Sequence, residues 1–136
     1  MKKTFLIVFI LSLISCQDFT RKKIVGYWVV DDILIKKSKF AIMLNTMTFK
    51  KDESCILPQP VHGYRFKSQV FGKWYLFRQN GEQLLEIDTD FIPYNGVYKI
   101  RLYDSLSISR MTLINDSNLF QCSKMEVHWG RLGGVD

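Results

Sequence analysis

The sequence predicts an all-β protein, a single antiparallel up-and-down meander of about eight strands that closes into a small barrel. Its apolar runs are short and rich in Val, Ile, Thr, Tyr, Phe and Trp, the residue types enriched in strands. Prolines and glycines separate these runs. No run has the pattern of a helix that connects two strands by crossing over the sheet. The alternative for such a meander is to fold into a sandwich. Closure would remove the two strand edges whose backbone groups an open meander leaves unpaired.

The first half of the domain combines clear strands with one irregular segment. Asp31 and Asp32 mark a bend inside the first strand. Pro58 and Pro60 cannot donate to a ladder, so residues 55–60 are expected at a sheet edge or in a loop. The runs expected to form strands are 24–35, 40–50, 62–70 (irregular), 73–78, 83–88, 97–103, 106–113 and 119–129.

The best local signal in the domain is a hairpin turn at Asn80-Gly81. Two strand-like runs flank this pair, and Asn-Gly suits the positive φ angles of a type I′ turn. Residues 89–96 carry Pro93 and Gly96 and are expected to form a longer loop at the rim of the barrel.

The strand after the rim loop has the pattern of a strand that is buried on one side. Tyr98, Ile100 and Leu102 fall on one face, and Lys99 and Arg101 fall on the other. The next run is less cleanly sorted between its two faces.

The last run, residues 119–129, also alternates. Met125 and Val127 share an apolar face, whereas Cys122 and Lys124 share a more polar face. This run is the last of the roughly eight strands of the expected closed meander.

The N-terminus has the layout of a secretory signal. Residues 1–3 supply a positive start, and residues 5–14 form an apolar run that only one serine interrupts. A spanning helix needs about 20 apolar residues, whereas this run reaches polar Gln17 soon after its end. Spanning is therefore the weaker interpretation.

The segment Leu13-Ile14-Ser15-Cys16 resembles the lipobox of bacterial lipoproteins. The resemblance implies cleavage before Cys16 and a lipid chain on its sulfur, because only a thiol can form the thioether and a small Ser15 admits the peptidase. In enteric bacteria an Asp after the lipidated cysteine favours retention in the inner membrane, and Gln17 stands there instead. We therefore expect a lipid-anchored protein of the cell envelope, with the outer membrane favoured. The alternative is an ordinary signal peptide followed by a chance cysteine.

These features divide the chain into four segments. Residues 1–15 are the expected signal peptide, 16–23 a lipidated N-terminus and tether, 24–129 the barrel domain and 130–136 a frayed tail. The mature chain is long enough for one modest domain and too short for two with separate cores.

The charge balance argues against nucleic acid as a partner. The precursor carries a formal charge of +6, of which Lys2 and Lys3 belong to the signal peptide. The remaining basic residues are scattered, whereas a nucleic-acid binder concentrates them in a stripe.

With Cys16 acylated, two cysteines remain. An oxidising compartment would permit Cys55 and Cys122 to form a disulfide if their Cα atoms lie within about 7 Å. Otherwise they are two ordinary thiols, and the sequence leaves both alternatives open.

The start of the first strand, with Gly26 and Trp28 in the order G-x-W, resembles the signature of lipocalins. Residues 47–52, 72–76 and 98–100 continue the resemblance over nearly the whole mature chain. It implies a lipocalin-like barrel that Trp28 closes at one end. The chain departs from the family in being shorter than a typical secreted lipocalin and in lacking an evident C-terminal helix, which puts a roomy cavity in doubt.

Aromatic side chains are the candidates for lining a ligand cavity. A barrel of about eight strands can either fill with side chains or hold one small ligand, so each candidate is either core or pocket wall. The candidate lining residues are Trp28, Phe49, Trp74, Phe77 and Tyr98.

No catalytic or metal-binding pattern is present. His62 and His128 lie in no metal-ligand motif, and we expect neither an enzyme nor a cofactor. Two functions remain. The first is a lipid-anchored module that binds a small hydrophobic or amphipathic molecule in its barrel. The second is a filled barrel that binds an envelope protein, for instance through loops 58–64 and 89–96.

Overall fold

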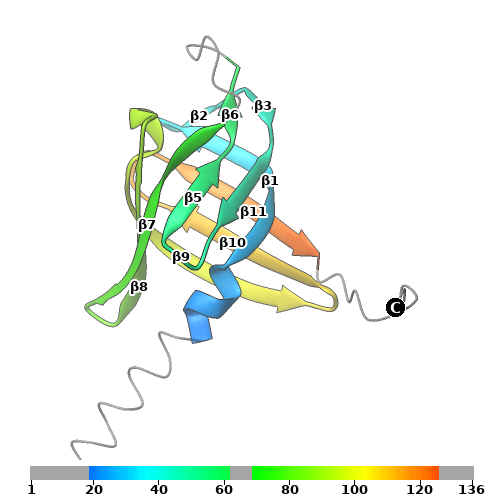
Figure 1. Cartoon of the computed structure of the whole chain (residues 1–136), viewed down its shortest axis with the longest axis vertical. Helices are drawn as coiled ribbons and strands as arrows, with labels where there is room; N and C mark the ends of the chain where they lie inside the picture. Colours follow the sequence, from blue (N-terminus) through cyan, green and yellow to red (C-terminus); the bar gives the residue numbers. More distant parts are fainter. Residues whose placement is uncertain (1–18, 62–68, 126–136) are drawn as a thin grey trace, which may run out of the picture.

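The computed structural model describes residues 19–61 and 69–125, which form a closed eight-stranded antiparallel barrel (Figure 1). Consecutive barrel strands are neighbours, and the last strand pairs with the first, so the expected up-and-down closed meander is confirmed. The barrel strands are β1 (Gly26–Ile35), β4 (Thr46–Phe49), β5 (Ser54–Leu57), β7 (Val70–Gln79), β8 (Glu82–Thr89), β9 (Gly96–Ser105), β10 (Ile108–Ile114) and β11 (Leu119–Met125).

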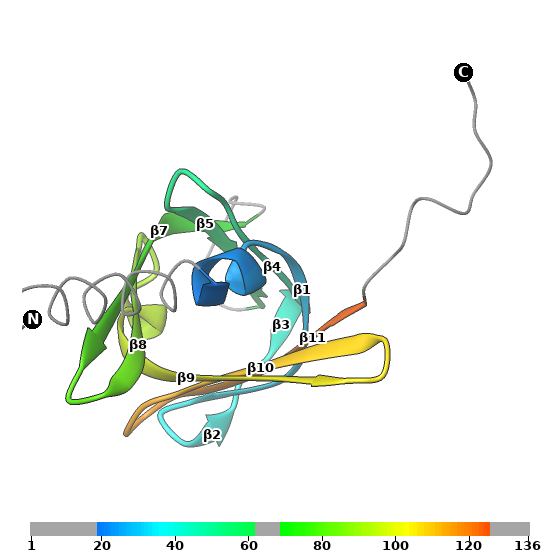
Figure 2. The ribbon, with the colours of Figure 1, turned by 90° about the horizontal axis from the view of Figure 1, so that it is seen from below.

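Five smaller elements lie at the two ends of the barrel. A short helix, residues 19–24, precedes β1 and lies across one end, which we call the helix end (Figure 2). The opposite end, called the η1 end, carries β2 (Ser38–Lys39), the ribbon of β3 (Ile42–Leu44) with β6 (Gln59–Pro60), and the 3-10 helix η1 (Ile92–Tyr94). No helix among the described residues has the length and apolar character needed to span a bilayer.

The expected bend in the first strand is a β-bulge in β1. The register of β1 against β11 shifts between Val30 and Asp32, which leaves Asp31 as the extra residue. Because of the bulge, Val30 and Ile33 are both buried although they are three positions apart, while Asp31 is exposed.

One segment expected at an edge or in a loop is a full member of the barrel. β5 pairs with β4 on one side and with β7 on the other. The two prolines of the segment do not interrupt it, because Pro58 follows the strand and Pro60 belongs to the separate β6. The run expected as one strand over 40–50 is divided among β3, β4 and the loops beside them.

The hairpin turns depend on residues with positive φ. Asn80 and Gly81 have φ angles of 51° and 77°, so the expected type I′ turn joins β7 to β8. Leu106 was expected inside a strand, but its φ of 55° places it in the two-residue turn between β9 and β10. Its side chain is consequently fully exposed at the tip of that hairpin.

Residues 19–23 of the expected tether belong to the helix that lies across the end of the barrel. Trp28 is completely buried there, and its Nε1 donates a 2.7 Å hydrogen bond to the carbonyl of Ile24. Gly26 has a φ of 133°, and a Cβ at that position would lie 3.1 Å from Nζ of Lys124. A side chain at Gly26 would thus be strained and would also crowd this lysine.

The more polar face of the last strand faces inward. Phe120 and Cys122 are buried in the core, and Lys124 continues the same face to the helix end. Its Nζ lies 5.1 Å from the ring centroid of Trp28 and donates hydrogen bonds to the carbonyls of Lys23 (3.2 Å) and Val25 (3.1 Å). Lys124, a polar residue on this inner face, therefore holds the helix on the barrel.

We predict that Lys124→Ala lowers the free energy of unfolding by about 2 kcal/mol, because two carbonyls lose a charged donor and Trp28 loses its cation. Urea titration followed by tryptophan emission measures the change. Lys99→Ala is the matched control and should change stability by less than about 0.5 kcal/mol, because the one ion pair of Lys99 among the described residues is an exposed pair with Glu82. Equal effects of the two substitutions would contradict this role for Lys124.

Candidate functional site

Four of the five candidate lining residues lie inside the barrel and contact other side chains there. Trp28, Phe49, Trp74 and Tyr98 are at most 1% exposed. The rings of Phe49 and Trp74 meet edge to face with centroids 5.4 Å apart, and Tyr98 meets Phe120 in the same way at 5.7 Å. These four side chains are therefore part of the packed hydrophobic core.

The fifth candidate, Phe77, does not line the interior. It pairs across the ladder with Leu84, whereas the adjacent pair, Leu76 with Leu85, faces the core. Side chains alternate along a strand, so Phe77 lies on the outer face of β7. It is half-buried there.

The rim loop expected at 89–96 inserts a side chain into the η1 end of the barrel. Tyr94 is completely buried, and its hydroxyl donates a 2.9 Å hydrogen bond to the carbonyl of Pro58. Tyr98 in turn donates to the carbonyl of Tyr94 at 2.6 Å, and the amide of Asn118 donates to the Tyr98 hydroxyl at 2.9 Å. Burial raises the pKa of both tyrosines, so they remain neutral donors.

Other aromatic rings surround Tyr94 at this end. The centroids of Phe91, Phe120 and Phe40 lie 4.7, 5.5 and 6.0 Å from that of Tyr94, all close to edge to face. No buried polar side-chain atom among the described residues lacks a hydrogen-bond partner. The described interior is thus a satisfied core that extends from Trp28 at the helix end to Tyr94 at the η1 end.

The sequence left open whether Cys55 and Cys122 form a disulfide, and in the structure both are buried free thiols. Strands β4 and β1 lie between their strands. Because neighbouring strands are about 4.8 Å apart, the two Cα atoms are too distant for a bond. Cys122 instead lies 3.4 Å from Sδ of Met47. Burial, assisted by the charge of Asp88, raises the pKa of Cys55 to about 12.

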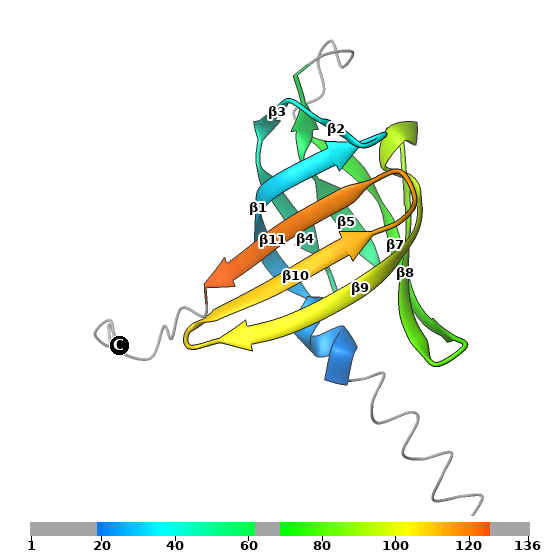
Figure 3. The same cartoon turned by 180° about the vertical axis from the view of Figure 1, so that it is seen from behind.

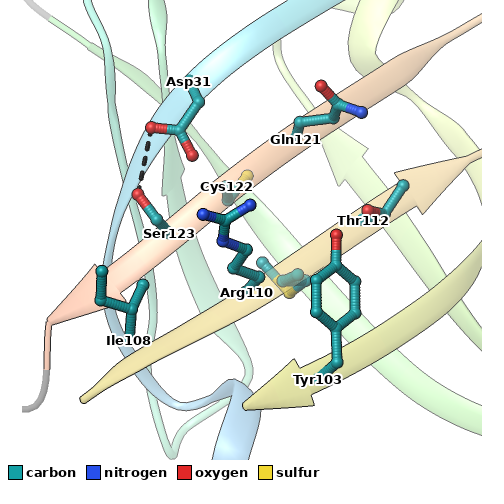
Figure 4. Close-up of a pocket in the computed structure, with 9 residues that line it drawn as sticks. Asp31, Tyr103, Ile108, Arg110, Thr112, Gln121, Cys122 and Ser123 are labelled. Atoms are coloured by element: carbon teal, nitrogen blue, oxygen red, sulfur yellow. Dashed lines mark hydrogen bonds between the residues drawn. The ribbon is translucent and has the colours of Figure 1, made fainter. Parts of the chain in front are cut away.

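A hollow of about 360 Å³ is present on the outer wall of the barrel, where β9, β10, β11 and β1 run side by side (Figures 3 and 4). Met111 and Cys122 point inward from its floor. The residues that line it are Asp31, Tyr103, Ile108, Arg110, Met111, Thr112, Gln121, Cys122 and Ser123.

The register of four strands explains the shape of this wall hollow. Tyr103, Arg110 and Ser123 form one row across β9, β10 and β11. Ser123 is small, so it leaves space beside the two long side chains. The bulge in β1 places Asp31 at the far edge, where its carboxylate accepts a 3.0 Å hydrogen bond from the Ser123 hydroxyl.

Arg110 is the central charge of the wall hollow, with its guanidinium between Ser123 and Tyr103 (Figure 4). It forms no ion pair with any residue in 19–61 or 69–125. A guanidinium presents a planar fork of donors that matches a carboxylate. The wall hollow can therefore bind a carboxylate, with the phenol of Tyr103 and the amide of Gln121 beside it.

Sequence reasoning did not single out Arg110 or Tyr103. One sequence feature could have indicated this surface. In run 106–113 apolar and polar residues are not separated between the two faces, and Ile108 shares a face with Arg110. The structure shows Ile108 at the edge of the wall hollow, 37% exposed. An apolar side chain beside a charged one on an outer face is a weak sign of a contact surface.

The remaining chemistry-bearing residues are not brought together. Among the described residues no group of three His, Cys, Asp or Glu side chains could hold a metal ion. His62, His128 and Cys16 lie outside the described residues. Loop 58–64 is described only up to Val61.

Comparison of the chain with protein-family models, with curated proteins and with solved structures gave no match. Function is therefore inferred from the sequence features and the geometry of this molecule alone.

We predict that a thiol reagent at pH 8 modifies neither Cys55 nor Cys122 in the folded protein. Both are buried, and a pKa of about 12 for Cys55 leaves almost no thiolate. In denaturant without reductant both should react, which mass spectrometry of a Cys16→Ser protein would show as two added labels. A failure to label in denaturant, reversed by reductant, would indicate a disulfide and contradict the arrangement of the strands.

Proposed function

We propose that this protein is a lipid-anchored lipoprotein of the cell envelope, whose lipocalin-like barrel binds another envelope protein through its outer wall. The supporting observation is the contrast between the two sides of that wall. The described interior is occupied by the protein's own aromatic side chains, whereas the wall hollow exposes Arg110 with no acidic partner among the described residues.

A ligand carried inside the barrel is the less favoured function. Small-molecule sites enclose about 300–1,000 Å³, and a guest of that size would have to displace large buried side chains. Tyr94 and Tyr98 could leave only by breaking their hydrogen bonds to Pro58 and to each other. Each bond contributes about 1 kcal/mol, and an unpaired buried group costs more.

The composition of the wall hollow suits a protein partner. Tyrosine and arginine are the side chains most often found among the dominant contacts of protein interfaces. Arg110 and Tyr103 are cross-strand neighbours on a closed sheet, so little backbone freedom is lost on binding. The partner segment is expected to bring a carboxylate to Arg110.

The lipid anchor is supported by the lipobox of the sequence. The described part of the chain begins three residues after Cys16, so a lipid on that residue would hold the barrel close to the membrane. Gln17 favours the outer membrane.

We predict that a photo-crosslinking amino acid at Gln121 captures one envelope protein in intact cells, in a stoichiometric adduct. Arg110→Glu should lower the adduct yield by at least about tenfold, because it replaces a central charge with one that repels the partner's carboxylate. Immunoblotting and mass spectrometry measure and identify the adduct.

Arg78→Glu is the matched control, because Arg78 is exposed on β7, away from the wall hollow. It should leave the adduct unchanged. Absence of a stoichiometric adduct, or an equal loss with Arg78→Glu, would contradict an interface on this wall.

We predict that Cys16→Ser releases the protein from membranes, because serine cannot form the thioether. Sedimentation of washed membranes measures the distribution, and mass spectrometry of the N-terminal peptide detects the lipid. Cys55→Ala removes a thiol from the core instead and should leave attachment intact. Continued attachment of Cys16→Ser would overturn the anchor.

A further inference from the structure

The short helix 19–24 is fixed to the barrel from three sides. Arg21 pairs with Glu53 at 3.2 Å, and its guanidinium lies 5.1 Å from the ring centroid of Trp74. On another side Lys23 pairs with Asp104 at 2.6 Å. Lys124 of β11 provides the third attachment through the two backbone carbonyls described above.

The contact between Lys23 and Asp104 is present at neutral pH. A hydrogen bond from Lys23 and a second from Ser109 hold the pKa of Asp104 below its usual range. The carboxylate is therefore charged at any pH near neutrality, and it joins the helix to the end of β9.

Three peptide units separate Phe19 from Cys16. A fully extended chain spans at most about 3.6 Å per residue, so the two Cα atoms are at most about 11 Å apart. Because the helix is fixed to the barrel, a lipid on Cys16 would bring the helix end next to the bilayer. The η1 end lies at the opposite end of the barrel (Figure 1) and would be directed away from it.

The helix end carries side chains that suit a bilayer surface. Phe19 is 61% exposed, and Leu106 is fully exposed at the tip of the adjacent β9–β10 hairpin. Lys22 and Lys51 are exposed at the same end. Apolar side chains can enter the head-group boundary, and each lysine close to anionic lipids contributes about 1 kcal/mol.

A second hollow, of about 240 Å³, lies between the helix and the strands β9, β10 and β11. It combines an apolar wall with three lysines and the carboxylate of Asp104. Lys23 is paired with Asp104 and Lys124 donates to two carbonyls, so the exposed Lys22 is the lysine best placed to meet the phosphate of a phospholipid head group. Its lining is Phe19, Lys22, Lys23, Trp28, Leu102, Asp104, Ser109 and Lys124.

The η1 end also exposes apolar side chains, and it is the competing membrane surface. Met43, Leu44, Val61 and Ile92 are each more than 40% exposed there. The length of chain between Cys16 and Phe19 decides between the two ends. If the η1 end lay on the bilayer, this segment would be too short for a lipid on Cys16 to reach the bilayer.

We propose that the helix end is a docking surface for an anionic phospholipid bilayer, which fixes the orientation of the barrel on the membrane. This inference rests on the proposed lipid anchor. Docking places the wall hollow beside the membrane surface, facing laterally, where another protein anchored in the same membrane can reach it.

The test uses the full lipidated protein in vesicles of phosphatidylethanolamine and phosphatidylglycerol. A polarity-sensitive fluorophore is attached at Leu106→Cys in one sample and at Met43→Cys in another, while the two native thiols are buried. Lipids with brominated acyl chains quench a fluorophore that enters the bilayer. The label at position 106 should shift to the blue and be quenched several times more strongly than the label at position 43.

Charge variants test the electrostatic part of the docking. Lys22→Glu combined with Lys51→Glu should lower the ratio of docked to undocked protein by at least about fivefold per residue. Lys37→Glu combined with Lys39→Glu changes the same charge at the η1 end and should have no effect. High salt should weaken docking in the first protein as the substitutions do.

Two outcomes would overturn the inference, and they differ from a failure of the anchor. Equal quenching at both positions, or stronger quenching at position 43, would reject this orientation while flotation with the vesicles still shows attachment. Release of the label from the bilayer by inorganic phosphate, but not by chloride of equal ionic strength, would identify the second hollow as a site for free phosphate instead. Protein that fails to float with the vesicles would reject the anchor, and the orientation with it.

Discussion

The antiparallel pairing of β1 with β11 is the interaction on which the rest of the structure depends. It closes the sheet and so creates an inside, where Cys122 and Phe120 are buried. The bulge within this pair turns Asp31 outward beside Ser123, and this forms one edge of the wall hollow. The same pairing brings Lys124 to the helix end. Closure, one edge of the wall hollow and one of the three attachments of the helix therefore depend on this strand pair.

The packing of the described interior bears on which surfaces can carry function. The aromatic side chains that could have bounded a cavity contact one another, and the hydroxyls of Tyr94 and Tyr98 are satisfied by neighbouring carbonyls. A core packed in this way resists the opening that a guest would require, because displaced polar groups would be left unpaired. This packing is why we propose recognition by the outer wall and by the helix end.

The sequence predicted the features that depend on neighbours along the chain. The alternation of Tyr98 with Lys99 and the Asn80-Gly81 turn are local patterns, and the structure confirms both. Features set by distant contacts could not be predicted in this way. The polar face of β11 is the inner face, where Lys124 meets the N-terminal helix, and Tyr94 fills the η1 end, where Pro58 supplies an acceptor. The wall hollow requires the register of four strands, which no single run of sequence contains.

The two proposals depend on the rigidity of the molecule in the same way. Ion pairs from Arg21 and Lys23 join the helix to opposite sides of the barrel, so the direction of the chain at Phe19 is fixed relative to the wall that carries Arg110. A flexible tether would let the barrel turn freely, and the wall hollow would then have no preferred height or direction. If Cys16 carries the proposed lipid, within about 11 Å of the fixed helix, a partner in the same membrane would need to search only two dimensions and one face of the barrel. An exposed Arg110 of modest intrinsic affinity can then be sufficient for binding, because the shared membrane raises the effective concentration of the partner.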